Sequence, residues 1–258
     1  MKKNVFFFII VLAIILAGCS GRDESEKDKI PPIPPVLTPH LGDTGDPPIE
    51  YGGQMIVLNE DNNGIDAVPD GDWIRVLWDP FKDTDLSHVR IYRFNDFNPE
   101  PVFMDSISAS AHYYLDTDTN IMERVWYSYF IDLVDLAGNT SRSDTTSYAL
   151  LPKSILISPA DNSVISPLNM SFKWHRIGSV GKFRIIFFDE NYNYVWHKDI
   201  TTNLENEEFE VIDFPVNTAQ QYAGQSLRWR VDSFEYDADK EEYMGSESNE
   251  RIIHIGQI

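Results

Sequence analysis

The chain lacks a second cysteine, a membrane-length apolar run and a surplus of basic residues. Cys19 is the only cysteine among 258 residues, so no internal disulfide supports the folded parts and their hydrophobic cores must suffice. The longest apolar run, Val5 to Ala17, is shorter than the ~20 residues that a bilayer-spanning helix needs. Lys and Arg number 21 against 41 Asp and Glu, a net charge of −20. Because such a surface repels phosphate backbones, we expect no nucleic acid as a partner.

Motifs of common enzyme classes are also missing. The sequence has no Gly-x-Ser-x-Gly elbow, no His-Glu-x-x-His pair and no phosphate-binding glycine loop. The pairs Asp116 with Asp118 and Glu207 with Glu208 offer the two carboxylates that glycoside hydrolysis uses, but among 41 acidic residues such pairs arise by chance. We therefore predict a non-catalytic protein, with a hydrolase of unrecognised site as the remote alternative.

The N-terminus has the order of a secretory signal peptide. Two lysines precede the apolar run, and small residues end it. The ending Leu16-Ala17-Gly18-Cys19 resembles the lipobox of bacterial lipoproteins. This resemblance implies that residues 1–18 are removed and that Cys19 carries acyl chains such as palmitate as the first mature residue. The alternative, a buried thiol in a short core helix, would not explain why the lysines precede the apolar run.

Residues beyond the cysteine bear on location. Ser20 stands where aspartate would resemble an inner-membrane retention signal, which favours the outer membrane. Asp23-Glu24 resembles the acidic signal that exports some lipoproteins to the surface. We expect a lipid-anchored protein of the bacterial cell envelope, periplasmic or surface-exposed. Its expected partners are the membrane, through the anchor, and an envelope protein or polysaccharide.

The segment 19–50 contains charged residues followed by seven prolines between Pro31 and Pro48. Prolines favour extended polyproline geometry at roughly 3.1 Å per residue. The composition therefore predicts a disordered, semi-rigid, lipidated stalk. A proline-rich ligand for an aromatic groove is the alternative.

Strand periodicity dominates the rest of the chain. Apolar residues recur at every second position in runs of five to eight, separated by Gly, Pro, Asn and Asp. No long segment has the helical period, which argues against an α/β enzyme fold. We predict an all-β protein with two domains in tandem, 51–150 and 151–258.

The first domain resembles a fibronectin type III domain over about 70–150. The residues that carry the resemblance are Val76–Pro80, Asp85–Arg93 and Tyr127–Asn139. The resemblance implies an immunoglobulin-like sandwich whose first strand lies among Gln54–Leu58, with a long insertion after it.

The same resemblance assigns structural roles. Trp78 would be the core tryptophan of the second strand, and Tyr129 the corner tyrosine whose hydroxyl bonds to nearby backbone. Asp135 to Asn139 would form a hairpin turn, with Gly138 at positive φ.

The pattern repeats in the second half, with Trp174 and Trp229 at inward positions. Superposing Tyr129–Asp132 on Trp229–Asp232 suggests a second fibronectin-like or immunoglobulin-like sandwich, in which a tryptophan replaces the corner tyrosine. Arg251–Ile255 would be its last strand. The short linker predicts a semi-rigid pair.

Two further groups are candidate binding sites. Tyr192, Tyr194 and Trp196 form an aromatic cluster that could stack on sugar rings, with packing at the rim of the sandwich as the alternative. The second group has the oxygen-ligand spacing of a calcium loop, with an Asn/Asp/Gly-rich turn as the alternative. Its expected ligands are Asn59, Asp61, Asn63, Asp66 and Asp70. We expect no cofactor other than this calcium.

These features predict a lipid-anchored envelope protein of the adhesion, scaffold or ligand-binding type. A carbohydrate-binding accessory lipoprotein is the alternative.

Overall fold

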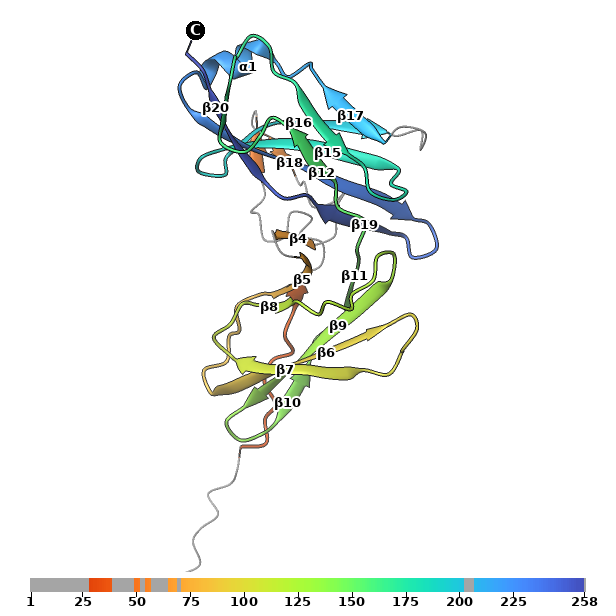
Figure 1. Cartoon of the computed structure of the whole chain (residues 1–258). Helices are drawn as coiled ribbons and strands as arrows, with labels where there is room; N and C mark the ends of the chain where they lie inside the picture. Colours follow the sequence, from red (N-terminus) through yellow and green to blue (C-terminus); the bar gives the residue numbers. More distant parts are fainter. Residues whose placement is uncertain are drawn as a thin grey trace, which may run out of the picture.

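Alternating apolar residues give each strand one face that must be buried, and the strands bury these faces in two β-sandwiches stacked end to end (Figure 1). The fold class prediction is confirmed. The described part contains strands β1 to β20 and one short helix, α1 (Val216–Gln221). The computed structural model describes residues 28–38, 49–51, 54–56, 65–68, 71–201 and 207–257.

The first sandwich packs a four-stranded sheet on a five-stranded one, and every pairing in it is antiparallel. The smaller sheet has β5 at its centre, paired with the other three strands, and the larger has the order β10-β9-β6-β7, with β11 also on β9. The strands of the smaller sheet are β1 (Leu37–Thr38), β4 (Ile65–Val68), β5 (Gly71–Trp78) and β8 (Tyr113–Asp116). Those of the larger are β6 (Leu86–Asn95), β7 (Val102–Ser108), β9 (Trp126–Asp135), β10 (Thr140–Arg142) and β11 (Thr146–Ala149).

The core of the first sandwich lies between these sheets. Val76 and Trp78 of β5 face Ile91 of β6 and Tyr129 of β9, and all four side chains are buried. The indole Nε1 of Trp78 donates to the carbonyl oxygen of Ala111 at 2.9 Å, so this buried N–H is satisfied.

The second sandwich packs a three-stranded sheet on a six-stranded one. β13 runs parallel to β20, whereas the remaining pairs are antiparallel. The smaller sheet contains β12 (Ile155–Ser158), β14 (Phe172–His175) and β17 (Glu208–Val211). The larger contains β13 (Ser163–Ile165), β15 (Lys182–Asp189), β16 (Tyr194–Thr201), β18 (Ser226–Asp237), β19 (Glu242–Glu247) and β20 (Arg251–Ile255), the last of which is the final strand expected from the sequence.

Aromatic rings fill the second core. Phe172 lies 4.7 Å from Phe187 and 5.1 Å from Trp229, measured between ring centroids. Phe214 packs on Phe187 at 4.8 Å, and Trp174 is fully buried. Edge-to-face pairs of this kind add ~0.5–1.5 kcal/mol each beyond the area they bury.

The expected stalk, 19–50, is wrong for residues 28–38, the longer of its two described parts. Leu37 of β1 pairs with Trp78 of β5 and is 5% exposed, and Pro32 and Pro35 are buried. Proline is tolerated at the edge of a sheet, because the N–H it lacks would face away from the ladder. This short run therefore packs along the first sandwich instead of standing clear of it.

The first strand expected among Gln54–Leu58 is also placed differently. Among the described residues, β3 (Gln54–Ile56) pairs with β2 (Ile49–Tyr51) alone, in a separate two-stranded hairpin near β16. The side of β5 opposite β8 is taken instead by β4, which pairs with Gly71–Ile74, and by β1, which pairs with Leu77 and Trp78.

The turn expected at 135–139 is confirmed. Asp135 N donates to the carbonyl oxygen of Asn139 at 3.1 Å, and Gly138 has φ of 90°. Glycine adopts this left-handed conformation at no steric cost. The turn closes the β9–β10 hairpin at the end of the molecule opposite the C-terminus (Figure 1).

Candidate functional sites at the junction and on the second sandwich

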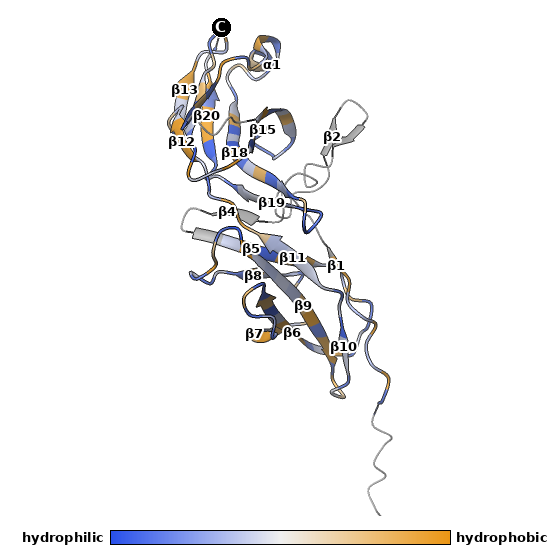
Figure 2. Ribbon diagram, turned by 90° about the vertical axis from the view of Figure 1, so that its right-hand side faces the viewer, coloured by the Kyte–Doolittle hydropathy of each residue, from blue (hydrophilic) through white to orange (hydrophobic). Residues whose placement is uncertain are grey.

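The junction between the sandwiches is packed as well as covalently linked. Leu150 forms a parallel bridge with Gly245 of β19, and Leu151 N donates to the same glycine's carbonyl oxygen at 3.1 Å. Trp126 and Ala149, from the first sandwich's strands, are buried within the core cluster of the second. β4 and β11 lie beside β19, as both ribbon views show (Figures 1 and 2).

Polar contacts cross the same junction. Trp126 Nε1 donates to Asp237 Oδ2 at 2.8 Å. Arg124 pairs with Glu235 at 3.0 Å, and its guanidinium also donates to the carbonyl oxygen of Ser179. Arg124 has φ of 59°, a conformation that costs about 1–2 kcal/mol for a non-glycine residue. The surrounding contacts hold it there, which indicates that the junction is a fixed connection.

A pocket of about 240 Å³ opens at this junction. Its wall on the first sandwich is rich in hydroxyl groups, and two of these, Ser128 Oγ and Ser147 Oγ, lie 2.8 Å apart. The second sandwich contributes Lys240 and Glu242. Such a lining can exchange hydrogen bonds with a polyhydroxylated ligand. The complete lining is Trp126, Ser128, Thr145, Thr146, Ser147, Lys240 and Glu242.

Sequence reasoning missed this pocket. Ser128 and Ser147 are unremarkable polar residues in strand positions, and only the β9–β11 pairing sets them opposite each other. Lys240 lies nearly a hundred residues further along the chain and reaches the site through the turn between β18 and β19. No linear motif could have signalled the combination.

The corner tyrosine bonds to a carboxylate, not to backbone as expected. Tyr129 Oη donates to Asp116 Oδ2 at 2.7 Å, and both residues are buried. Arg93 donates to the same oxygen at 2.7 Å and to Asp118 Oδ2 at 2.7 Å. β8 ends at Asp116, and this places the Asp116 carboxylate at the corner. The hydroxyl of Tyr129 therefore bonds to this carboxylate and not to a backbone oxygen.

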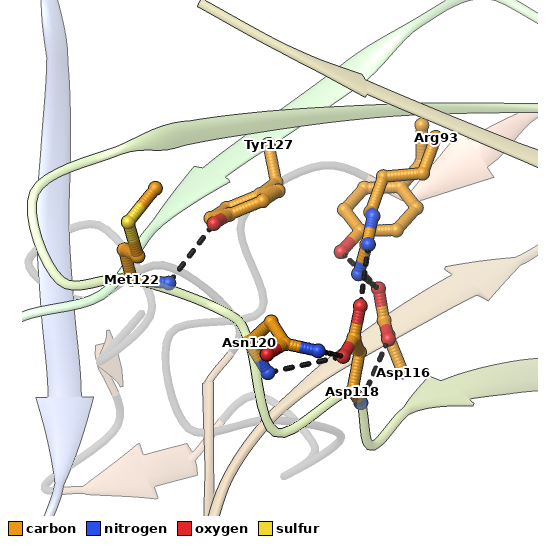
Figure 3. Close-up of polar contacts among 7 residues, drawn as sticks. Arg93, Asp116, Asp118, Asn120, Met122 and Tyr127 are labelled. Atoms are coloured by element: carbon orange, nitrogen blue, oxygen red, sulfur yellow. Dashed lines mark hydrogen bonds and ion pairs between the residues drawn. The ribbon is translucent and has the colours of Figure 1, made fainter. Parts of the chain in front are cut away.

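The network extends into the loop after β8. Asn120 donates to Asp118 through both its backbone and side-chain nitrogens, and Met122 N donates to Tyr127 Oη at 2.9 Å (Figure 3). The guanidinium of Arg93 lies 5.3 Å from the centre of the Tyr127 ring. The loop is thus fixed to the core of the first sandwich.

Titration in this cluster follows from burial and charge. Burial, reinforced by the Asp116 carboxylate, raises the pKa of Tyr129 well above its usual value and that of Tyr114 to about 12. The hydrogen bond from Arg93 lowers the pKa of Asp118. A carboxyl held ionised in this way is a poor general acid at neutral pH. The Asp116 and Asp118 pair is built into a structural ion-pair network.

The predicted aromatic platform is divided between two faces of a sheet. Trp196 packs into the core against Phe187 at 5.7 Å and Phe214 at 5.1 Å. Tyr194 packs on the opposite face, beside Phe188, where its hydroxyl lies 2.7 Å from His197 Nδ1. A register shift at this point of the β15–β16 pair separates them.

Tyr192 is the one exposed member of the platform, at 49%. It lies in the turn before β16 with φ of 61°, and the Arg228 guanidinium sits 4.6 Å from its ring centre. Arg228 is ion-paired with Glu250 at 2.6 Å. The ring therefore has an arginine on one face, so the three predicted residues do not form a common binding surface.

The calcium prediction falls mostly outside the described residues. Asn59, Asp61, Asn63 and Asp70 lie there, whereas the backbone of Asp66 belongs to β4, where it pairs with Trp73. The calcium loop therefore stays a prediction. Within the described ranges, a different acidic group, Asp28 with Asp85 and Asp135, brings carboxylate oxygens within 4.8 Å of one another.

Cys19 and the expected signal peptide, residues 1–18, also lie outside the described residues. In the part that the structure describes, no helix is long and apolar enough to span a bilayer.

Comparison with known proteins gives no family. No protein-family model and no curated protein matches the sequence. Among solved structures, the chain is similar to the FN1–FN3 domains of chicken CNTN1, with 12% identity, a TM-score of 0.29 and coverage of 88% of this chain and 68% of that one.

Two other solved structures extend the comparison. A 1.5-MDa bacterial ice-binding adhesin matches with 7% identity and a TM-score of 0.28, over 89% of this chain and 67% of that one. Pectate lyase PelI from Erwinia chrysanthemi matches with 16% identity and a TM-score of 0.26, over 40% of this chain and 29% of that one. The fold assignment rests on the strand order and pairing described above.

Proposed function

We propose that this protein is a non-catalytic, lipid-anchored component of a bacterial cell envelope, in which two sandwiches form a rigid unit for adhesion, scaffolding or ligand binding. Outer-membrane attachment through acylated Cys19 is part of this proposal. Its support is the lipobox-like ending Leu16–Cys19 together with a folded part that begins close behind it.

The observation that carries the proposal is the fixed junction. The buried Trp126 joins the second core, and pairs of polar side chains cross between the sandwiches, among them Trp126 with Asp237, Arg124 with Glu235 and Lys240 with Asp96. Two domains joined only by a flexible linker could not hold a surface at a set distance from an anchor. A packed junction can, and this is what a scaffold or adhesin requires.

The anchor is tested by expressing Cys19→Ala. We expect the loss of acyl labelling and a shift of the protein from the membrane to the soluble fraction, since Cys19 is the only thiol. Unchanged labelling and unchanged fractionation would exclude the lipoprotein assignment. Release of soluble products from purified envelope polysaccharide by the pure protein would contradict the non-catalytic part.

The junction pocket favours a second candidate function, carbohydrate binding. The pocket has a hydroxyl-rich wall and is lined by both sandwiches, so it offers a polyhydroxylated ligand hydrogen-bonding groups on two sides. A glycan array probed with the wild type, Ser147→Ala and Tyr192→Ala tests it. Binding lost in Ser147→Ala alone would support the pocket, binding lost in Tyr192→Ala alone would support the rim of the second sandwich, and absence of binding would exclude this function.

A further inference from the structure

The proline-rich segment is fixed along the first sandwich by contacts at several points. Ile33 N donates to Asp83 Oδ2 at 3.0 Å, and Asp79 N donates to the carbonyl oxygen of Val36 at 3.0 Å. Further along, Leu37 pairs with Trp78. Because these contacts follow one another along the chain, the segment leaves little slack between residue 28 and the sheet.

The start of this segment lies at one end of the molecule. Asn139 Nδ2, in the turn of the β9–β10 hairpin, donates to the carbonyl oxygens of Asp28 at 3.0 Å and Ile30 at 3.3 Å. The chain enters the described part at this end, and the C-terminus lies at the far end of the second sandwich (Figures 1 and 2).

The distance to the anchor is therefore short. Asp28 follows Cys19 by nine residues, which can span at most about 30 Å when fully extended. A free stalk over all of 19–50 would have reached roughly 95 Å at ~3.1 Å per residue. The docked prolines thus bring the first sandwich close to whatever holds Cys19.

The end at which the chain enters the described part exposes apolar side chains. Leu136, in the turn of the β9–β10 hairpin, is 75% exposed, and Ile30, whose carbonyl oxygen accepts from Asn139 of the same turn, is 77% exposed. The acidic group of Asp28, Asp85 and Asp135 borders them. Two apolar side chains can enter the headgroup region of a bilayer, whereas the carboxylates favour neutral over anionic headgroups.

We propose that this end of the first sandwich, formed by the turn 135–139 and residues 28–30, rests on the lipid surface, so that the second sandwich points away from the membrane. The inference rests on the proposed acylation of Cys19. The partner of this surface is the bilayer that holds the acyl chains, because the short connection keeps Leu136 at a high effective concentration there. The junction pocket and the second sandwich are left free for other partners.

The test uses the lipidated full chain in phosphatidylcholine vesicles that contain a headgroup-attached nitroxide quencher. Since acylated Cys19 has no free thiol, Leu136→Cys can be labelled with a single fluorophore. Leu168→Cys is the matched control, because it is 60% exposed in the loop after β13, near the end of β20. We expect several-fold stronger quenching at position 136 than at position 168.

A second variant tests the connection itself. A 20-residue Gly/Ser insertion between Lys27 and Asp28 leaves every described contact in place, and we expect it to remove most of the quenching at position 136. Equal quenching at positions 136 and 168, in protein that carries acyl label and floats with vesicles, would overturn the orientation and leave the lipoprotein assignment standing. Protein without acyl label or flotation would overturn both.

Discussion

The two sandwiches share an architecture but stabilise its centre by different chemistry. At the corner of the first, Tyr129 donates to the buried carboxylate of Asp116, which Arg93 also binds. At the equivalent place in the second, Trp229 packs among Phe172 and other rings, and its Nε1 has no hydrogen-bond partner among the described residues. One fold therefore tolerates either a polar network or an aromatic cluster at its corner.

Each of the two corners carries its own free-energy cost. A buried N–H without a partner costs about 1–3 kcal/mol, and Trp174 Nε1 has the same property within the described chain. Aromatic packing offsets this cost through area and ring geometry. The corner of the first sandwich avoids this cost but depends on charges, since a buried ion pair is stable only while both partners remain. This corner should therefore respond to pH, whereas the aromatic corner of the second sandwich should respond to loss of volume.

The largest expected effect comes from removing an indole in either core. Trp174→Ala should destabilise the second sandwich by ~3–5 kcal/mol, because it leaves a cavity among packed rings. Trp78→Ala should do the same in the first sandwich, with the added loss of its bond to Ala111. Hydrogen exchange resolved by strand would locate each loss. Loss of protection spread equally over both sandwiches in each variant would mean that they do not have separate cores.

Breaking the polar network should come next. Asp116→Ala removes the acceptor shared by Arg93 and Tyr129 and should cost about 3 kcal/mol, at the low end for a broken buried pair since Arg93 is partly exposed. Tyr129→Phe should cost about 1–3 kcal/mol. Chemical denaturation of the single and double variants would measure their coupling, with exposed Asp144→Ala as the control, expected within about 0.5 kcal/mol of the wild type. Additive effects would contradict a shared network.

Alkaline pH should distinguish the sandwiches. The pKa of Tyr129 is raised well above its usual value by burial, and that of Tyr114 to about 12. Their contribution to stability is fully present below the unfolded pKa of about 10 and is lost as pH rises through the folded values. We expect amide protection in β9 to fall above about pH 10 before protection in β15 does, and Tyr129→Phe to reduce this dependence. Parallel loss in both strands would contradict it.

Acid should act through Asp118. Because Arg93 lowers its pKa in the folded state, its contribution is present above the unfolded pKa of about 3.9 and is lost as pH falls through the folded value. Asp118→Asn should therefore flatten the decline of the unfolding free energy of the first sandwich below about pH 4. An unchanged slope in acid titrations of the melting temperature would show that the ion pair contributes nothing.

Calcium should give the smallest effect, if the predicted loop binds it. Millimolar calcium should raise the melting temperature of the full chain, and a chelator should lower it, because binding only to the folded state stabilises that state. Asp61→Ala should abolish the difference. Identical melts with calcium, with chelator and in the variant would leave the turn as the correct interpretation.

Local patterns predicted the strands well. Alternation of side chains predicted that Trp78, Trp174 and Trp229 lie inside, and all three are buried. Gly138 could be assigned a positive φ from the turn residues around it. These features depend on neighbours within a few residues, so a linear sequence contains the necessary information.

Long-range competition could not be predicted in the same way. Composition alone favoured a free stalk, but Leu37 pairs with Trp78 of β5, on the side of the sheet where a later strand was expected. Likewise, the register shift in the β15–β16 pair puts Tyr194 and Trp196 on opposite faces of the sheet, although they are two residues apart. An edge or a bulge exists only once several strands are assembled.

By itself, the sequence determined the all-β class, the tandem of two sandwiches and the inward tryptophans, because side-chain alternation and turn residues act over short distances. Tertiary structure alone decided three features: the carboxylate that meets Tyr129, the pocket between Ser147 and Lys240, and the docking of residues 28–38 on the first sandwich. Each of these joins groups that lie on different strands or loops and are not neighbours in the chain. Their contact depends on sheet order and junction packing, which no local propensity encodes.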